Sequence, residues 1–214
     1  MVAVAAMAVF VVTLLAARGR DVASIEAEVF RTVNTAPVWL YRPVWPLMQF
    51  GNVLIACTAA VIVAALLRRW RVAVAGVVAC VAAWYLAKVV KNVVERGRPE
   101  VYLPDVRLPG VPEDGFGFIS GHSTVAFALA TVLGAALPRR WRGVPFAIAT
   151  VVAIARLYVG VHLPLDVVGG AAAGVAIGSV VNAVTVRRDP VDQSVQSVAT
   201  SPTGQATPVP PNPQ

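Results

Sequence analysis

The apolar residues of this chain are gathered into six blocks, which are separated by short polar segments. A helix of about 20 predominantly apolar residues spans the hydrocarbon core of a bilayer, and the blocks approach that length. We therefore predict an all-α fold, an integral membrane bundle of about six transmembrane helices. The predicted spans are 1–17, 51–67, 72–91, 122–137, 145–160 and 164–185.

The first block, 1–17, has the apolar character of a secretory signal peptide. It lacks the basic residues that begin such a peptide, and it is long for the apolar region of one. We therefore expect a membrane helix at this position rather than a cleaved signal.

Three other segments differ in composition from the blocks. The stretch PVWLYRPVWP at 37–46 alternates aromatic residues with prolines, which is typical either of the bilayer interface or of a packed loop. The loop 92–121 contains a Pro- and Gly-rich stretch, 99–118, without helical periodicity, and long loops of this kind are usually functional or mobile. The tail 189–214 is polar and rich in proline, so we expect it to be disordered. The membrane domain is thus predicted to extend over 1–188.

Basic residues at the ends of the blocks predict the topology. The sequence RRWR occurs at 68–71 and again at 139–142, and a basic pair follows the last block at 187–188. These sites follow the second, fourth and sixth spans, so the positive-inside rule places all three in the cytoplasm. Arg18 and Arg20 argue mildly for the opposite orientation. We expect both termini to be cytoplasmic, in a plasma or inner membrane, with the long loop on the outer side.

Composition agrees with a membrane protein. Hydrophobic residues make up 57% of the chain and charged residues 14%, whereas soluble domains carry about 25% charged residues. The net charge of +7 is interpreted as charge that sets topology, not as a nucleic-acid surface. Cys57 and Cys80 lie within apolar blocks and form neither a disulfide framework nor a zinc pattern.

The first of three polar clusters follows the third block, in KNVVERGRP at 91–99. Lys91 and Arg98 are seven residues apart, nearly two helical turns, so a continuous helix would place both on one face. Pro99 disfavours a helical conformation for Arg98, and we expect the helix to end near Gly97. Taken alone, the two basic residues could simply extend to the membrane surface from the end of a span.

The second cluster opens the fourth block, in GFISGHSTVAFALA at 117–130. Ser120 is a suitable N-cap for a helix that begins near His122, and Gly121 would let the backbone approach a ligand closely. The free N–H groups at this helix start, together with the helix dipole, would form an anion site. A capped helix without a ligand is the alternative interpretation.

The third cluster joins the last two blocks, in ARLYVGVHLPLD at 155–166. Pro164 suits the first turn of the last span, which places Asp166 in the same turn. Asp166 follows His162 by four residues, close enough to accept the N–H of the imidazole ring. A carboxylate that fixes the tautomer of a histidine leaves the other ring nitrogen free as a base or nucleophile. A structural His–Asp pair is the alternative.

The predicted topology brings the three clusters to one face of the membrane, where ionisable groups are costly and indicate function. A phosphoryl group could be bound and attacked here, and its leaving oxygen protonated, by three cations, a helix N-terminus, two histidines and a carboxylate. Arginine matches phosphate geometry through its guanidinium fork. The ionisable residues are Lys91, Arg98, Arg156, His122, His162 and Asp166.

These clusters resemble the signature of the type-2 phosphatidic acid phosphatase superfamily, the lipid phosphate phosphatases that share a core with vanadium haloperoxidases. The first family motif, K-x6-R-P, matches residues 91–99. The second, P-S-G-H, corresponds to residues 119–122, and the third, S-R-x5-H-x3-D, to residues 155–166. Order and spacing fit, and the likeness extends over 1–188 through the six-span layout.

Two positions depart from the family pattern. Ile119 replaces a proline, which should loosen the turn before Ser120 without removing any chemistry. Ala155 replaces a serine that would donate a hydrogen bond to the phosphate, so the pattern predicts that one donor is missing.

The resemblance implies a role for each matched residue. His162 would attack phosphorus and form a phosphohistidine, Asp166 would orient it and balance its charge, and His122 would protonate the departing lipid oxygen. The phosphate would be held by Lys91, Arg98, Arg156, Ser120 and Gly121. No metal or other cofactor is expected, because the basic side chains supply the positive charge and the chain has only two histidines.

The implied function is a membrane lipid phosphatase that acts on a lipid phosphate or diphosphate monoester. Polyprenyl diphosphate, phosphatidic acid and phosphatidylglycerophosphate are the candidate substrates, membrane lipids are the expected surroundings, and no nucleic acid is expected as a partner. A phosphotransferase with an acceptor other than water would use the same residues, and a non-catalytic membrane protein that keeps an anion site is the third possibility. A haloperoxidase and a serine hydrolase at Ser120 are disfavoured.

Glycines recur every four residues in the last block, at Gly170, Gly174 and Gly178. Small residues at this spacing let two membrane helices approach closely. We expect these glycines to pack against another helix of the same bundle; a homodimer formed through them is the alternative.

Overall fold

The computed structural model describes residues 1–19, 21–110 and 113–185. Every regular element in these residues is a helix, which confirms the predicted all-α fold. The predicted tail, 189–214, and the basic pair at 187–188 lie outside the described residues. The long helices are α1 (Val2–Ala17), α4 (Val53–Leu66), α5 (Trp70–Val94), α7 (Gly121–Ala136), α8 (Gly143–Tyr158) and α9 (Pro164–Thr185).

Each predicted apolar block forms one of these long helices. Within the described residues, two stretches are long and apolar enough to cross a membrane, Trp70–Tyr102 and α9. A third crossing results if Val38–Gly51 and α4, which meet at a bend of 76°, count as one broken span. α1 and α7 are apolar but have only 16 residues each. The membrane bundle is therefore confirmed, whereas a crossing by all six helices stays a prediction.

Shorter helices lie in the segments between the blocks. The predicted loop 37–46 is largely helical, and α2 was not expected at all. α2 has 11 residues and buries Ala27 and Phe30 on one face while Glu28 and Thr32 remain exposed. A search for long apolar runs does not find such an amphipathic helix. The short elements are α2 (Ser24–Asn34), η1 (Val38–Leu40), α3 (Tyr41–Met48), η2 (Gln49–Gly51), α6 (Pro99–Tyr102) and η3 (Arg139–Trp141).

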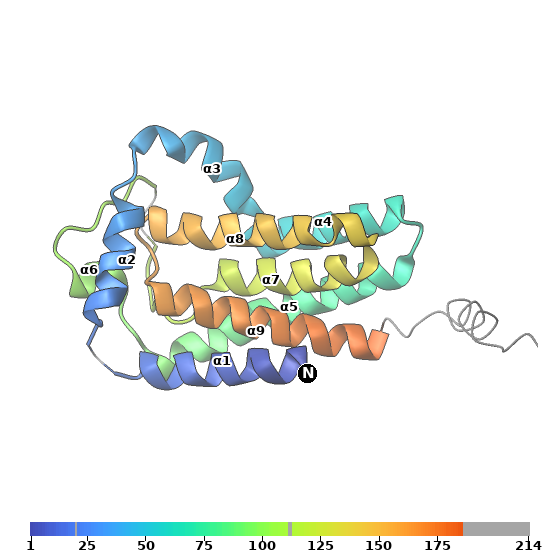
Figure 1. Cartoon of the computed structure of the whole chain (residues 1–214), viewed down its shortest axis with the longest axis horizontal. Coiled ribbons are helices and arrows are strands. Elements are labelled where there is room, and N and C mark those ends of the chain that lie inside the picture. Colours follow the sequence, from blue (N-terminus) through green and yellow to red (C-terminus); the bar gives the residue numbers. More distant parts are fainter. Residues whose placement is uncertain (20, 111–112, 186–214) are drawn as a thin grey trace, which may run out of the picture.

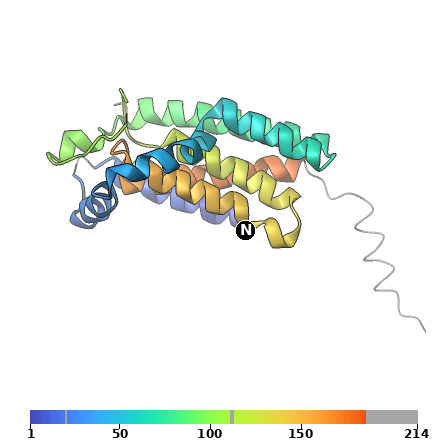
Figure 2. The same ribbon diagram turned by 90° about the horizontal axis from the view of Figure 1, so that it is seen from above.

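Helix α7 lies at the centre of the bundle. It contacts α4, α5, α8 and α9, and in Figure 2 it lies between α4 and α5 on one side and α8 on the other. α7 buries residues around most of its circumference. Its small and β-branched side chains allow the neighbouring helices to approach this closely. The start of α7, with Ser120 and His122, is therefore packed among several neighbouring elements.

The glycines of α9 face α7. A Cβ added to Gly170 would lie 2.7 Å from the carbonyl oxygen of Ser120, and one added to Gly178 would lie 2.6 Å from Cβ of Thr131. These glycines, together with Gly174, are buried within the bundle. Packing inside the bundle is thus confirmed, and a homodimer through the same glycines has no support because α7 covers them.

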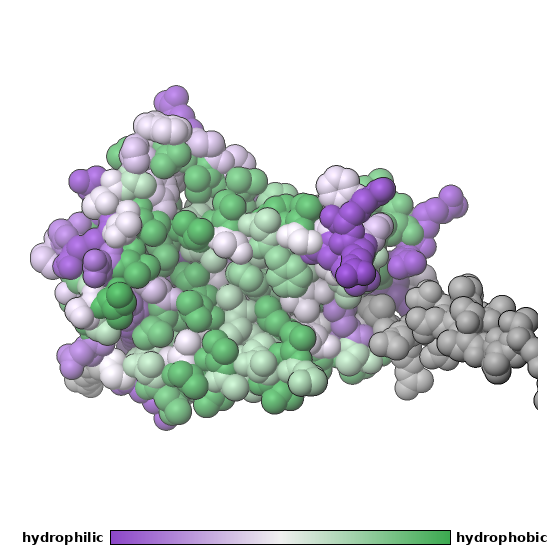
Figure 3. All heavy atoms as spheres, in the orientation of Figure 1, coloured by the Kyte–Doolittle hydropathy of each residue, from purple (hydrophilic) through white to green (hydrophobic). Residues whose placement is uncertain are grey.

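The bundle has two distinct ends. The N-terminus, the turn between α4 and α5 and the turn between α7 and α8 share one end, and α2, α6 and the α8–α9 connection share the other (Figure 1). Between the ends, a broad band of hydrophobic side chains covers the face seen in Figure 3. Exposed valines on the long helices, among them Val11, Val61 and Val78, contribute apolar surface that suits lipid hydrocarbon.

Candidate active site

The first motif begins on α5 and continues beyond its end. The helix ends at Val94, earlier than the expected Gly97, because Glu95 adopts a left-handed conformation with φ 53°. Arg98 is extended, as Pro99 predicted. Lys91 and Arg98 therefore do not share one face of a continuous helix. Each instead donates to the loop between α6 and α7, Lys91 through Nζ to the carbonyl oxygen of Phe116 at 2.6 Å and Arg98 through Nε to that of Gly115 at 3.0 Å.

The second motif forms the start of α7, as expected. The Oγ of Ser120 accepts a long hydrogen bond from the backbone N–H of Ser123 at 3.4 Å, which confirms the N-cap. The backbone N–H of Ser120 donates to the carbonyl oxygen of Asp166 at 3.0 Å and so joins the second motif to the third. A Cβ on Gly121 would meet only Ala87, at 3.7 Å. Protein packing therefore does not require glycine at this position.

His122 packs against the short helix η2. A Cβ on Gly51 would lie 2.6 Å from Cβ of His122, so only glycine at position 51 leaves room for this imidazole. His122 also lines a pocket of about 200 Å³ at the active-site end of the bundle. The pocket is lined by Tyr41, Trp45, Met48, Gln49, Gly110, Glu113, His122, Arg156, Val159 and Val161.

The third motif places His162 in the connection before α9 and Asp166 in the first turn of that helix. Pro164 is the first residue of α9, as predicted. Nδ1 of His162 lies 3.4 Å from Oδ2 of Asp166 without the alignment of a hydrogen bond, and Oδ2 accepts the backbone N–H of Leu163 at 2.8 Å. Both side chains are almost completely buried.

The surroundings of His162 favour its neutral form. Burial lowers the pKa of His162 well below its usual value, and the charges of Lys91 and Arg156 lower it further. A histidine with a lowered pKa stays unprotonated at neutral pH. Its ring nitrogens are therefore available as nucleophile or base.

The guanidinium groups of Arg98 and Arg156 are bridged by one carboxylate, that of Glu113 in the loop between α6 and α7. Glu113 Oε2 accepts from Arg98 at 3.3 Å, and Oε1 accepts a very short hydrogen bond from Arg156. Both arginines are buried, whereas the side chain of Glu113 is 38% exposed. Burial raises the pKa of Glu113, but the charge and hydrogen bond of Arg156 outweigh this effect and lower it to about 2. The expected phosphate cradle thus already holds an anionic group.

Three residues of this region were not identified from the sequence. Glu113 lies within the long loop that was expected to be functional or mobile, but no motif marks this residue. Arg96 lies inside the first motif, between the two expected basic residues, and Glu26 comes from α2, which no apolar run indicated. Arg96 pairs with Glu26 and with Asp166 in the interior. Within the described residues, no group of three or more His, Cys, Asp or Glu side chains could hold a metal ion.

A sequence model of the PAP2 superfamily matches residues 72–190, more than half of the chain. The chain belongs to the PAP2 superfamily. This membership confirms the family that the three motifs indicated. A decaprenylphosphoryl-5-phosphoribose phosphatase of Mycobacterium tuberculosis, found in two strains, is 31% identical over 136 residues, which cover 63% of this chain and 71% of that phosphatase.

Two solved structures of PAP2-like proteins share the fold. A transmembrane PAP2 type phosphatidylglycerolphosphate phosphatase from Bacillus subtilis has a TM-score of 0.73 and 24% identity, covering 87% of this chain and 97% of its own. LpxE of Aquifex aeolicus has a TM-score of 0.64 and 28% identity, covering 76% and 96% of the two chains. The predicted phosphatase-type helical core is therefore confirmed.

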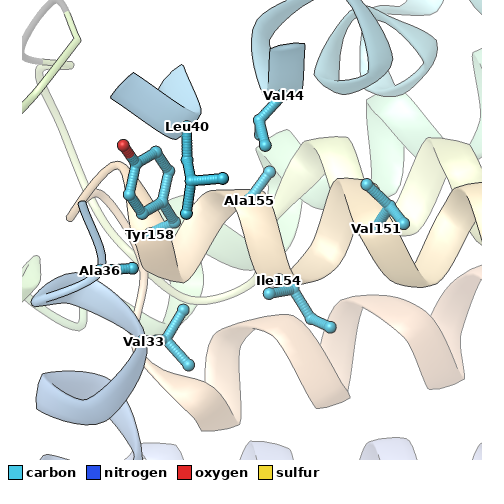
Figure 4. Close-up of a pocket in the computed structure, with 8 residues that line it drawn as sticks. All are labelled: Val33, Ala36, Leu40, Val44, Val151, Ile154, Ala155 and Tyr158. Atoms are coloured by element: carbon cyan, nitrogen blue, oxygen red, sulfur yellow. The ribbon is translucent and has the colours of Figure 1, made fainter. Parts of the chain in front are cut away.

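The two departures from the PAP2 motifs both lie in apolar surroundings. Ile119 is fully buried and packs with Phe118 and Ala87, while Ser120 keeps its capping role. Ala155 points into an apolar pocket of about 200 Å³ between α2, α3 and α8 (Figure 4), and it does not line the polar pocket that contains Glu113. The position of Ala155 therefore gives no support to the expected loss of a phosphate donor.

Proposed function

We propose that this chain is a membrane lipid phosphatase that hydrolyses a lipid phosphate or diphosphate monoester through a phosphohistidine, without a metal ion. The observation that carries the proposal is the placement of His162. It is buried beside Asp166, and its charged neighbours include Arg98 and Arg156, whose guanidinium groups already hold a carboxylate. Such a site combines a neutral nucleophile with preformed positive charge for phosphoryl oxygens.

In the first step, Nε2 of His162 attacks phosphorus, and the bond from phosphorus to the leaving oxygen breaks. As the ring becomes positively charged, the carboxylate of Asp166, whose Oδ2 lies 3.4 Å from Nδ1, accepts a hydrogen bond from the Nδ1–H and balances that charge without taking the proton. The negative charge of the bound phosphoryl group favours a protonated His122, which gives its proton to the leaving oxygen. The lipid then departs as an alcohol, or as a monophosphate when the substrate is a diphosphate.

In the second step, water attacks the phosphohistidine and the phosphorus–nitrogen bond breaks. His122, now neutral, takes a proton from the water, and inorganic phosphate is released. Both histidines thereby return to their initial states. Arg98, Arg156 and Lys91 hold the phosphoryl oxygens through both steps, together with the N–H groups at the start of α7.

The substrate is proposed to be a phosphorylated lipid with a long hydrocarbon chain. The names of the relatives support this class, because they describe phosphatases of decaprenylphosphoryl-5-phosphoribose and of phosphatidylglycerolphosphate. The apolar pocket in Figure 4 supports it as well. That pocket lies between the helices α3 and α8 that also line the polar pocket, so a chain could enter it from a headgroup held at Arg156.

We also propose that the site faces the outer side of the cell membrane, with both termini in the cytoplasm. The arrangement of the bundle supports this orientation, because the N-terminus and both RRWR segments lie at the end opposite to the α8–α9 connection (Figure 1). Basic residues at that end favour a cytoplasmic location.

Phosphate release from defined lipid phosphates by the purified protein tests the proposal. Release in the presence of EDTA is expected, and it should fall by about a thousandfold or more in His162→Ala, because loss of a nucleophile removes the main reaction path. Arg31→Gln, on the exposed surface of α2, is the control and should keep full activity. Activity that survives His162→Ala would refute the mechanism, and substrate loss without free phosphate would indicate transfer to another acceptor.

A further inference from the structure

An ion network without a place in the mechanism lies behind the catalytic carboxylate. It consists of Glu26 from α2, Arg96 from the α5–α6 connection and Asp166 from the first turn of α9. The exposed fractions of the three side chains are 5%, 1% and 0%. Burying three ionised groups is costly, and such a network is weak evidence for stability on its own. Because the network includes Asp166, we expect it to have a role in the proposed active site.

The geometry of the network is specific. Arg96 Nη2 donates to Glu26 Oε2 at 2.7 Å, and Nη1 donates to Glu26 Oε1 at 3.2 Å, so the ion pair is bidentate. Nη1 also donates to Asp166 Oδ1 at 2.9 Å. Arg96 therefore hydrogen-bonds to Oδ1, the oxygen of Asp166 that faces away from His162. The other oxygen, Oδ2, is the one near Nδ1 of His162.

Glu26 ties the same network to the backbone at the start of α9. Its Oε1 accepts the backbone N–H of Leu165 at 2.9 Å, while Asp166 Oδ2 accepts that of Leu163 at 2.8 Å. Two N–H groups in the connection and first turn, which no helix carbonyl can satisfy, thus bind carboxylates of the network. The carboxylate of Asp166 is fixed on both oxygens.

We propose that Arg96, held by Glu26, is a positioning residue that sets the orientation and charge of Asp166 toward His162. The inference rests on the proposed function, because it assigns a role within that same reaction. Without Arg96, the carboxylates of Glu26 and Asp166 would face each other in the interior. Asp166 would then rotate or take up a proton, and the negative charge that stabilises the phosphorylated ring of His162 would be weakened.

Substrate binding depends on a different set of groups. Arg98 and Arg156 hold the carboxylate of Glu113, whereas the side chain of Arg96 donates its hydrogen bonds within the described residues to Glu26 and Asp166, and neither of these lines the polar pocket. A positioning residue of this kind should change the rate of chemistry and leave phosphate binding unchanged. A purely structural role would instead lower the fraction of folded protein and leave kcat per folded molecule unchanged.

The test compares Arg96→Gln, Arg96→Lys and Glu26→Gln with the control Arg31→Gln, using p-nitrophenyl phosphate as a soluble substrate. Arg31 also lies on α2 and pairs with Asp105 at 3.0 Å, but both side chains are exposed. For Arg96→Gln we expect kcat and kcat/KM to fall together by about tenfold to a hundredfold, as for other outer residues that orient a catalytic group. KM should stay within about twofold.

The other variants refine the expected result. Arg96→Lys keeps the charge and should recover part of the rate, and Glu26→Gln keeps the shape of the acceptor for Leu165 and should lose about threefold to tenfold in kcat. Thermal unfolding in detergent measures the folded fraction of each variant. If Arg96→Gln does not fold, Glu26→Gln carries the test, because it replaces one carboxylate oxygen with nitrogen and leaves the packing in place.

The outcomes separate the inference from the proposed function. Wild-type protein that releases no phosphate would contradict the proposed function itself. Active wild-type protein with unchanged kcat in the folded Arg96 or Glu26 variants would overturn the positioning role alone. A rise in KM with unchanged kcat would also overturn it, because it would assign Arg96 to binding.

Discussion

The most informative single residue of the site is Glu113, because its carboxylate occupies the position in which the proposed mechanism places the phosphoryl group. Its two oxygens pair with Arg98 and Arg156, and its charge competes with any anion that approaches these cations. A substrate must displace this carboxylate before both guanidinium groups can bind phosphate. On the proposed mechanism, Glu113 should therefore weaken phosphate binding, and its carboxylate balances the buried positive charge of both arginines.

Removal of this charge should tighten binding. We expect Glu113→Gln to lower the KM for p-nitrophenyl phosphate by roughly threefold to tenfold, which corresponds to about 0.7–1.4 kcal/mol, the net scale of one ordinary hydrogen bond. The pKa of Glu113 lies at about 2, below the usual value for a glutamate, so the carboxylate is charged at every working pH. The ratio of the two KM values should therefore be the same from about pH 5 to about pH 8.

Steady-state kinetics at several pH values measures both effects. The control is Asp105→Asn, which removes another loop carboxylate that pairs with the exposed Arg31. A higher KM in Glu113→Gln would show that the carboxylate assists binding and would contradict this account.

Position 155 shows what motif matching can and cannot supply at the residue scale. The match correctly indicated the family, but the loss of a phosphate donor was inferred without knowing where the side chain points. In the structure Ala155 faces Val44 in the apolar pocket. The roles of Arg96 and Glu26 were equally invisible, because they depend on contacts across 70 residues of chain.

At the scale of helices, the apolar pocket between α3 and α8 should discriminate between substrates. We expect Val44→Trp to fill this pocket and to raise the KM for a long-chain lipid phosphate several-fold, because the chain loses its apolar surface. The KM for p-nitrophenyl phosphate should not change. Val74→Trp, at an exposed position on α5, is the matched control, and an equal effect in both variants would contradict the assignment.

The packing of α9 against α7 should depend on the missing side chains of its glycines. A Cβ at Gly174 would press on the backbone of Thr124 and lie 2.9 Å from the backbone nitrogen of Ala128, whereas one at Gly143 would meet nothing within 4 Å. We expect Gly174→Ala to destabilise the bundle by about 1–3 kcal/mol. Gly143→Ala should be neutral or slightly stabilising. Denaturation in detergent measures both, and equal stability would contradict the packing role.

The helices themselves were predictable to different degrees. Long apolar runs identified all six long helices, because burial in lipid demands continuous apolar sequence. α2 and α3 were missed, because a short helix that packs on the outside of a bundle needs only one apolar face. The end of α5 was placed too late, since the left-handed turn at Glu95 carries no glycine to mark it.

At the scale of the whole molecule, the two ends of the bundle should lie on opposite sides of the membrane. A reporter fused after Arg188 should be cytoplasmic, and one inserted in the loop near Asp105 should be external, because the RRWR segments favour the cytoplasm. Enzymatic reporters that are active on only one side of the membrane measure this. The reverse pattern would place the site in the cytoplasm and contradict the proposed orientation.

The central claim is that His162 carries the phosphoryl group during catalysis. Rapid quenching of the enzyme with a labelled lipid phosphate, followed by mass spectrometry under conditions that preserve phosphohistidine, tests it most directly. The account predicts a phosphoryl group on the peptide that contains His162, in the presence of EDTA, and none on the same peptide from His162→Ala. Labelling of His122 instead, or turnover without any phosphohistidine, would contradict it.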